Sequence, residues 1–242
     1  MSRLWSAQRG AVATLLAALG LLVAWDLLGA DLPLDRLFGT AAGFALRENF
    51  WTARVLHDGG RWLAGIALLA LLADTLRRPA QGPSRQRRLA WLGVVLLSLL
   101  LVPVIKRVSL TSCPWDLAEF GGSAAYVPHW LFAQADGGPG HCFPSGHAVS
   151  AFGFLGVHYL WRDHDARRAR AALLAVLALG TLFGAAQVMR GAHHLSHVLW
   201  SAWLCWAVAW TAHVAQGLLQ LQRRRHPASG PDRHPRPTPR TG

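Results

Sequence analysis

Two short stretches of the sequence combine histidines with residues that can bind an anion. The first is HCFPSGH, residues 141–147, which stands directly before an apolar segment. Pro144 fits the start of a helix, Ser145 can cap that helix, and Gly146 lets a ligand approach the backbone. Because the free N–H groups at a helix start attract anions, Ser145 and Gly146 are predicted to bind one beside His147. The plainer alternative is a capped helix start with an idle histidine.

The second stretch is QVMRGAHHLSHVLW, residues 187–200. Arg190, His193 and His197 share one face if the backbone there is helical. An arginine can bind phosphoryl oxygens while one histidine attacks phosphorus and the other orients it. His193 and His197 could also hold zinc, but no glutamate follows in the H-E-x-x-H manner, so neither a metal nor another cofactor is expected. His194 is expected to point elsewhere, toward the membrane interface.

The composition indicates an integral membrane protein. Of 242 residues, 52% are hydrophobic, and they fall in blocks near the ~20 residues that a membrane-spanning helix needs. We expect an all-α bundle of six transmembrane helices, over residues 11–28, 62–76, 89–105, 148–161, 171–188 and 198–218. One membrane domain then covers residues 1–222. A basic, proline-rich cytoplasmic tail over 223–242 is predicted to be disordered.

The net charge of +12 is distributed in arginine clusters at every second boundary between apolar blocks. This alternation is typical of the positive-inside rule and argues against a nucleic-acid surface. It predicts that both termini are cytoplasmic and that residues 29–61, 106–147 and 190–197 face outward, toward the periplasm of a bacterial inner membrane. Residues 29–61 are expected to lie along the interface, anchored by Phe50 and Trp51.

The outer segment 106–147 holds a lysine and two cysteines of interest. Lys106 is the single lysine of the chain, which favours a need for a compact ammonium there, although a cation reaching for the interface is an equal alternative. Cys113 and Cys142 lie where disulfides can form, and they are either bonded to each other or two buried thiols. Cys205 lies within a predicted helix and is expected to serve packing.

Together these motifs resemble the type-2 phosphatidic acid phosphatase superfamily of membrane lipid phosphatases. The family pattern has a lysine-led motif ending in Arg-Pro, then Pro-Ser-Gly-His, then an Arg…His…Asp motif. Lys106 and Cys113-Pro114 align with the first motif, residues 144–147 match the second in full, and His193 takes the nucleophile's place in the third. The resemblance covers about residues 89–203.

Three departures from that pattern stand out. Cys113 and Gln187 occupy positions where the family has arginine, so the resemblance leaves Arg107 and Arg190 to supply the missing phosphate ligands. His197 replaces the aspartate that orients the nucleophile, and Asp116 is an alternative carboxylate for that role. A neutral imidazole can accept the hydrogen bond but stabilises an imidazolium less than a carboxylate does.

The resemblance implies a lipid phosphatase that works through a phosphohistidine on His193. Lys106, Arg190, Ser145 and Gly146 would hold the phosphoryl oxygens, and His147 would act as the general acid and base. Undecaprenyl diphosphate, phosphatidylglycerol phosphate, phosphatidic acid and lipid A phosphates all fit as substrates. Transfer to a lipid acceptor, a non-catalytic lipid-binding protein and a serine protease using Ser145 are the rival functions.

Overall fold

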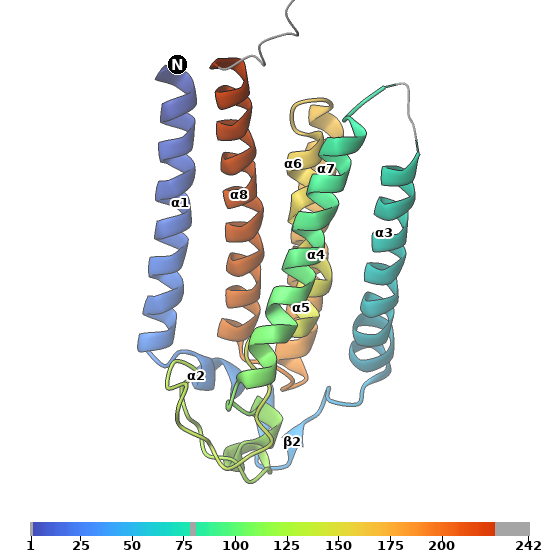
Figure 1. The fold of residues 1–242 in the computed structure, drawn as a ribbon. Coiled ribbons are helices and arrows are strands. Elements are labelled where there is room, and N and C mark those ends of the chain that lie inside the picture. The colour runs from blue at the N-terminus through green and yellow to red at the C-terminus, as the bar shows by residue number, and fades with distance from the viewer. Residues whose placement is uncertain (1, 78–80, 226–242) are drawn as a thin grey trace, which may run out of the picture.

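The computed structural model describes residues 2–77 and 81–225, and helices make up most of it. The long helices are α1 (Ser2–Leu27), α3 (Gly59–Leu76), α4 (Arg85–Val108), α7 (Ala166–Met189) and α8 (Leu195–Arg225). They form one bundle in which the start of α1 and the end of α8 lie at the same end (Figure 1). The prediction of a helical fold is confirmed. The predicted tail begins within α8, and its remainder from residue 226 lies outside the described residues.

Five helical segments are long and apolar enough to cross a membrane. They are Arg9–Leu27, Phe50–Leu76, Arg85–Val108, Ala166–Met189 and Leu195–Gln222. Each overlaps one of the six predicted crossings. The chain therefore has the features of a multi-pass membrane protein.

The remaining predicted crossing, residues 148–161, is helical but differs in kind. It consists of α5 (Gly146–Phe152), a 3-10 turn η4 (Gly153–Leu155) and α6 (Gly156–Trp161), which follow one another along the bundle (Figure 1). Most side chains of α5 are buried against α3, α4, α7 and α8. A short apolar helix with buried side chains is typical of a protein core. Such a helix does not need the ~20 apolar residues of a membrane span. A sixth crossing stays a prediction.

Glycines let the helices around α5 approach closely. A Cβ atom on Gly180 of α7 would lie 2.4 Å from the ring of Phe152, and one on Gly184 would lie 2.4 Å from a methyl carbon of Val198. Small residues at such positions allow helix backbones to pack tightly without a large side chain between them. The packing fixes α5 against α7 and α8, which carry or flank the second histidine stretch.

Residues 29–49, part of the segment expected to lie along the interface, form short elements rather than one long helix. They fold into α2 (Asp31–Asp35) and a hairpin of β1 (Gly39–Thr40) and β2 (Gly43–Phe44), because Gly43 has a left-handed φ of 99° that interrupts a helix. Residues 50–58 then form a π-helix, η1 (Phe50–Asp58), which runs into α3. Phe50 and Trp51 are 61% and 66% exposed, and their role as membrane anchors stays a prediction.

These elements form a cap at the end of the bundle opposite the N-terminus, which we call the loop end (Figure 1). The cap also contains two 3-10 turns, η2 (Pro114–Asp116) and η3 (Ala118–Phe120). Phe44 packs against Phe120 with ring centroids 4.9 Å apart, in a small core that includes Leu117 and Ala124. This core joins the hairpin to the loop that follows α4.

The loop between α4 and α5 is held as a closed unit. Its two ends run side by side, since His141 N donates to Ser109 O (2.8 Å) and Cys142 N donates to Thr111 O (2.9 Å). A disulfide joins Cys113 to Cys142 with an S–S distance of 2.07 Å. These bonds bring the HCFPSGH stretch against the last turn of α4, where Lys106 lies.

Two arginines of the predicted topology signal also have structural partners. Arg88 is 1% exposed, donates to Pro83 O and forms an ion pair with Asp74. Arg87 donates to Tyr159 O (2.7 Å) and to the carboxylate of Asp163 (2.8 Å). These contacts join the start of α4 to the ends of α3 and α6, so these two arginines also stabilise the fold.

Candidate active site

A polar cavity of about 350 Å³ lies at the loop end of the bundle. Its lining comes from η1 and α3, the end of α4, the disulfide loop, the start of α5, the end of α7 and the turn that follows α7. The lining residues are His57, Arg61, Lys106, Cys113, Trp115, Gly146, His147, Gln187, Ala192 and His193. The structure thus brings Lys106, His147 and His193, one residue from each predicted motif, to a single cavity.

Lys106 and Gly146 face each other across one side of the cavity. Lys106 lies in the last turn of α4, and a Cβ atom on Gly146 would lie 3.9 Å from its Nζ. The missing side chain of Gly146 therefore leaves space between the ammonium group and the start of α5. An anion placed there would contact a fixed positive charge.

His147 lies in the first turn of α5 and is 8% exposed. Its ring stacks on that of His57, with centroids 3.9 Å apart, and its Nε2 lies 2.8 Å from the carbonyl oxygen of His57. Since a carbonyl only accepts, Nε2 carries the hydrogen and Nδ1 of the neutral ring is left for proton exchange. Burial, followed by the positive fields of His57, Arg61 and Arg190, lowers the pKa of His147 to about 4.

The backbone N–H of Ser145 is not free for a ligand, contrary to the sequence prediction. It donates to the carbonyl oxygen of His197 (3.1 Å), while the Ser145 hydroxyl caps α5 by accepting from Ala148 N (3.4 Å). The side chain is fully buried and does not line the cavity. Ser145 therefore positions the start of α5 and lacks the access that a serine nucleophile needs.

His193 lies in the turn between α7 and α8. This turn depends on Gly191, which has φ 71° and on which a Cβ atom would lie 2.3 Å from the ring of Phe44. The N–H groups of Ala192 and His193 both donate to Gln187 O. The turn consequently holds His193 at the cavity with little freedom, and its side chain is only 5% exposed.

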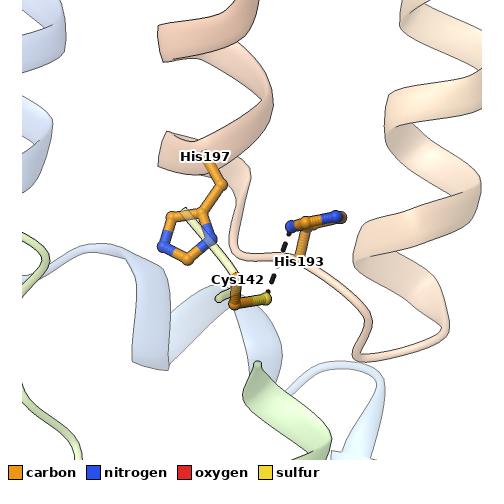
Figure 2. Close-up of side chains that lie close together, drawn as sticks. All are labelled: Cys142, His193 and His197. Atoms are coloured by element: carbon orange, nitrogen blue, oxygen red, sulfur yellow. Dashed lines mark hydrogen bonds between the residues drawn. The ribbon is translucent and has the colours of Figure 1, made fainter. Parts of the chain in front are cut away.

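One ring nitrogen of His193 rests against the disulfide. Nδ1 lies 3.5 Å from Sγ of Cys142, and Figure 2 shows Cys142 between His193 and His197. Because a disulfide sulfur has no hydrogen to donate, Nδ1 is the protonated nitrogen and Nε2 keeps its lone pair. Burial, and then the positive fields of Lys106 and His147, hold the pKa of His193 well below its usual range. The ring is therefore neutral and can act as a nucleophile.

His197 lies behind His193 rather than bonded to it. The two ring centroids are 5.9 Å apart, and the buried Nδ1 of His197 has no hydrogen-bond partner among the described residues. The rings of His194 and His129 meet His197 edge-on, with centroids 4.9 and 5.6 Å away. A direct orienting hydrogen bond from His197 to His193, expected from the sequence, is absent from the described contacts.

His194 is buried in the protein and does not face the membrane interface as predicted. It is 2% exposed, and its Nδ1 lies 2.5 Å from a carboxylate oxygen of Asp35. Burial disfavours the imidazolium, but the hydrogen bond and charge of Asp35 outweigh burial and raise the pKa of His194. Asp31 of the same short helix accepts from Ser196 N (3.0 Å), so α2 holds the start of α8 in place.

The other predicted phosphate ligands and the alternative carboxylate lie outside the cavity. Arg190 donates from Nε to Arg47 O (2.8 Å) and from Nη1 to the side chain of Gln187 (3.4 Å). Arg107 is exposed and lines no part of the cavity. The carboxylate of Asp116 accepts from Cys113 N (3.3 Å) in its own turn, and no hydrogen bond joins it to His193 among the described residues.

A metal site is disfavoured by the chemistry of the donors present. Cys142, His193 and His197 offer ligand atoms within 4.8 Å of one another. However, the sulfur of Cys142 is bonded to Cys113 and cannot bind a metal as a thiolate. Two imidazoles then remain, fewer than the three protein ligands of a catalytic zinc site.

The sequence-based prediction missed two basic cavity residues, His57 and Arg61, as well as Trp115. His57 and Arg61 lie in HDGGR, residues 57–61, directly before an apolar block. That stretch carries no spacing that indicates chemistry, and its contact with His147 spans 90 residues of sequence. The local signal in the sequence was weak: the oppositely charged Asp58 and Arg61 flank two glycines at the start of a predicted helix.

The fold and the site define a multi-pass helical membrane protein with histidines, a lysine and an arginine around one polar cavity. A family model described as the PAP2 superfamily matches residues 88–220, which is more than half of the chain. The chain therefore belongs to the PAP2 superfamily, as its resemblance to type-2 phosphatidic acid phosphatases indicated. Membership indicates a phosphatase that acts on a phosphate-containing substrate. No curated protein and no solved structure matches the chain.

Proposed function

We propose that the protein hydrolyses a lipid phosphate or diphosphate through a phosphohistidine on His193. The observation that carries this proposal is the meeting of Lys106, His147 and a neutral His193 at one polar cavity. Lys106 and the backbone at Gly146 would bind the phosphoryl oxygens and stabilise the charge that develops on them in the transition state. His193 supplies the nucleophile and His147 the proton.

In the first step Nε2 of His193 attacks phosphorus, and the bond from phosphorus to the leaving oxygen breaks. The leaving oxygen takes the proton from Nδ1 of His147 in its protonated imidazolium form, giving a lipid alcohol from a monoester or a lipid monophosphate from a diphosphate. In the second step water loses a proton to His147 and attacks phosphorus. The N–P bond then breaks, inorganic phosphate leaves, and both histidines return to their starting protonation states.

A lipid substrate is supported by an apolar hollow that begins one helical turn from the polar cavity. This hollow has a volume of about 400 Å³, and its lining includes Leu63, Ala64, Ser150, Ala151 and Phe183. These residues follow Arg61 along α3, follow His147 along α5, and precede Gln187 along α7. A phosphate in the polar cavity could therefore have its hydrocarbon chain between these helices.

We place the active site on the outer, periplasmic face of a bacterial inner membrane, with both termini in the cytoplasm. The disulfide supports this orientation, because such bonds persist in oxidising compartments. It lies at the loop end, whereas Arg85, Arg87 and Arg88 begin α4 at the other end. That arrangement agrees with the positive-inside rule.

The test is release of inorganic phosphate by detergent-purified protein from a panel of lipid phosphates and diphosphates. Wild type and His193→Ala are compared with EDTA present, since the proposed mechanism uses no metal. We expect release by wild type and its loss, by at least about 10³-fold, in the variant. Equal release by both proteins would refute the mechanism, and lipid phosphate formed without free phosphate would indicate transfer to a lipid acceptor.

A further inference from the structure

The polar cavity carries more positive charge than the proposed mechanism uses. Lys106 and Arg61 are the lysine and the arginine among its lining residues, and the lining contains no carboxylate. Arg61 enters from α3, whereas Lys106 enters from the end of α4. A cavity with cations from two separate helices suits an anion that both can contact.

The guanidinium of Arg61 has no partner among the described residues. No hydrogen bond or salt bridge joins it to residues 2–77 or 81–225, and Arg61 is exposed and lines the cavity. The nearest carboxylate in sequence, Asp58, is already engaged: one oxygen lies 2.9 Å from His57 Nδ1 and the other 3.5 Å from Arg54 Nη1. Arg61 differs in this respect from Arg190, whose donors are occupied by Arg47 O and Gln187.

The fold brings Arg61 to the cavity through close packing at the start of α3. A Cβ atom on Gly60 would lie 3.1 Å from the ring of Phe183 in α7, so the glycine lets the two helices meet. His57, one turn earlier, stacks on His147. The positive charge of Arg61 is one of the influences that lower the pKa of His147, after burial and His57, which places the guanidinium within electrostatic reach of that ring.

The positions where the family pattern has arginines provide a reason for this arrangement. They are held by Cys113, which is bonded in the disulfide, and by Gln187, which is neutral. Both residues line the cavity, so two potential cations are missing from its wall. Arg61 lies outside the matched residues 88–220 and supplies a charge from the N-terminal part of the chain.

We propose that Arg61 binds the non-reacting phosphoryl oxygens of the substrate, across the cavity from Lys106. This inference rests on the proposed function for the identity of the substrate. The planar guanidinium can donate two parallel N–H bonds to two oxygens, which an ammonium group cannot do. Arg61 thereby takes the place of the absent arginines at positions 113 and 187.

The experiment measures binding of inorganic orthophosphate to detergent-purified protein, from the phosphate-dependent rise in its thermal midpoint. Turnover is measured in parallel on the lipid substrate that wild type hydrolyses. Arg61→Ala is compared with Arg61→Lys and with Arg36→Ala. The last removes an arginine at the same end of the bundle that pairs with Glu119 outside the cavity.

We expect Arg61→Ala to weaken phosphate binding and raise KM by about 10- to 100-fold, as loss of a charge-assisted hydrogen bond does. Arg61→Lys should recover only part of this loss, and Arg36→Ala should bind as wild type does. Adding Gln187→Arg to Arg61→Ala should restore binding, because residue 187 lines the same cavity. A thermal transition of Arg61→Ala without phosphate, at a midpoint near that of Arg36→Ala, shows that the single variant is folded.

Phosphate binding by Arg61→Ala within about 2-fold of Arg36→Ala would overturn the assignment, as would a wild type that does not bind orthophosphate. The two proposals fail separately in this experiment. Arg61-dependent binding of phosphate without release of phosphate from any lipid would refute the proposed hydrolysis and keep the role of Arg61 as an anion ligand.

Discussion

The Sγ atom of Cys142 lies 3.5 Å from Nδ1 of His193, so the imidazole proposed as the nucleophile contacts a disulfide rather than a carboxylate (Figure 2). The sulfur can accept a hydrogen bond but cannot donate one. It therefore favours the tautomer in which Nε2 is unprotonated. The disulfide lies where an orienting group would lie, so we expect catalysis to depend on its integrity.

Reduction of the disulfide is expected to lower kcat by at least about 10-fold, because small displacements of a reacting group are costly. KM should change by less than about 2-fold. A bond closing a loop of this size also contributes about 3–4 kcal/mol to stability, so the thermal midpoint should fall.

Activity and thermal midpoint are measured for wild type with and without reductant, and for the Cys113→Ala/Cys142→Ala double variant. Cys205→Ala, which removes a buried free cysteine, is the control. Full activity of the reduced enzyme would contradict the positioning role.

The pH dependence of kcat/KM should reflect the low pKa of His147. The general acid must be protonated in the free enzyme, and the pKa of His147 is about 4 there. The protonated fraction therefore falls about tenfold for each pH unit above that value. After correction for ionisation of the substrate, kcat/KM should decline as pH rises from 5 to 8.

In the complex with substrate, the bound phosphate anion favours the imidazolium form of His147. The decline of kcat should therefore occur at higher pH than the decline of kcat/KM. A flat corrected profile, or the same profile in His147→Gln, would argue against His147 as the acid.

Removing Asp35 should destabilise the protein strongly. Asp35→Ala leaves the fully buried His194 without its carboxylate partner. Breaking one side of a buried pair costs about 3–5 kcal/mol, which corresponds to a fall of about 6–20 °C in the thermal midpoint. Glu119→Ala, which breaks the exposed pair with Arg36, is the control and should change the midpoint little. Similar midpoints for the two variants would show that the buried pair does not stabilise the fold.

Gly191 is expected to be irreplaceable in the turn that holds His193. Gly191→Ala puts a side chain at φ 71° and 2.3 Å from the Phe44 ring, so the turn must shift. We expect a loss of at least about 2 kcal/mol of stability and a fall in kcat, because His193 moves with the turn. Gly217→Ala in α8, where a Cβ atom meets nothing within 4 Å, is the matched control and should be neutral or stabilising. Wild-type activity in Gly191→Ala would exclude the proposed constraint.

The sequence was most informative where chemistry depends on local spacing. Lys106, His147 and His193 were selected from short motifs, and the structure brings all three to one cavity. The long helices were predictable because each must be apolar over most of a membrane thickness. By contrast, an apolar run such as 148–161 fits either a membrane span or a buried core helix, and only its neighbours distinguish the two.

The errors arose where a group's partner lies far away in sequence. The N–H of Ser145 was predicted to be free, but His197 O occupies it. His194 was expected at the interface, yet Asp35, 159 residues away, holds it in the interior. Arg61 had no local motif to indicate it. Such contacts follow from the packing of helices, which a single sequence does not specify.

The buried position of α5 has a mechanical consequence. The residues that follow His147, including Ala148, Val149 and Phe152, are shielded by surrounding helices rather than immersed in hydrocarbon. When a bilayer thins, thickens or is stretched, the outer helices adjust by tilting. The helix that carries His147, the proposed general acid, is shielded from that adjustment, so the enzyme should turn over at similar rates in membranes of different thickness.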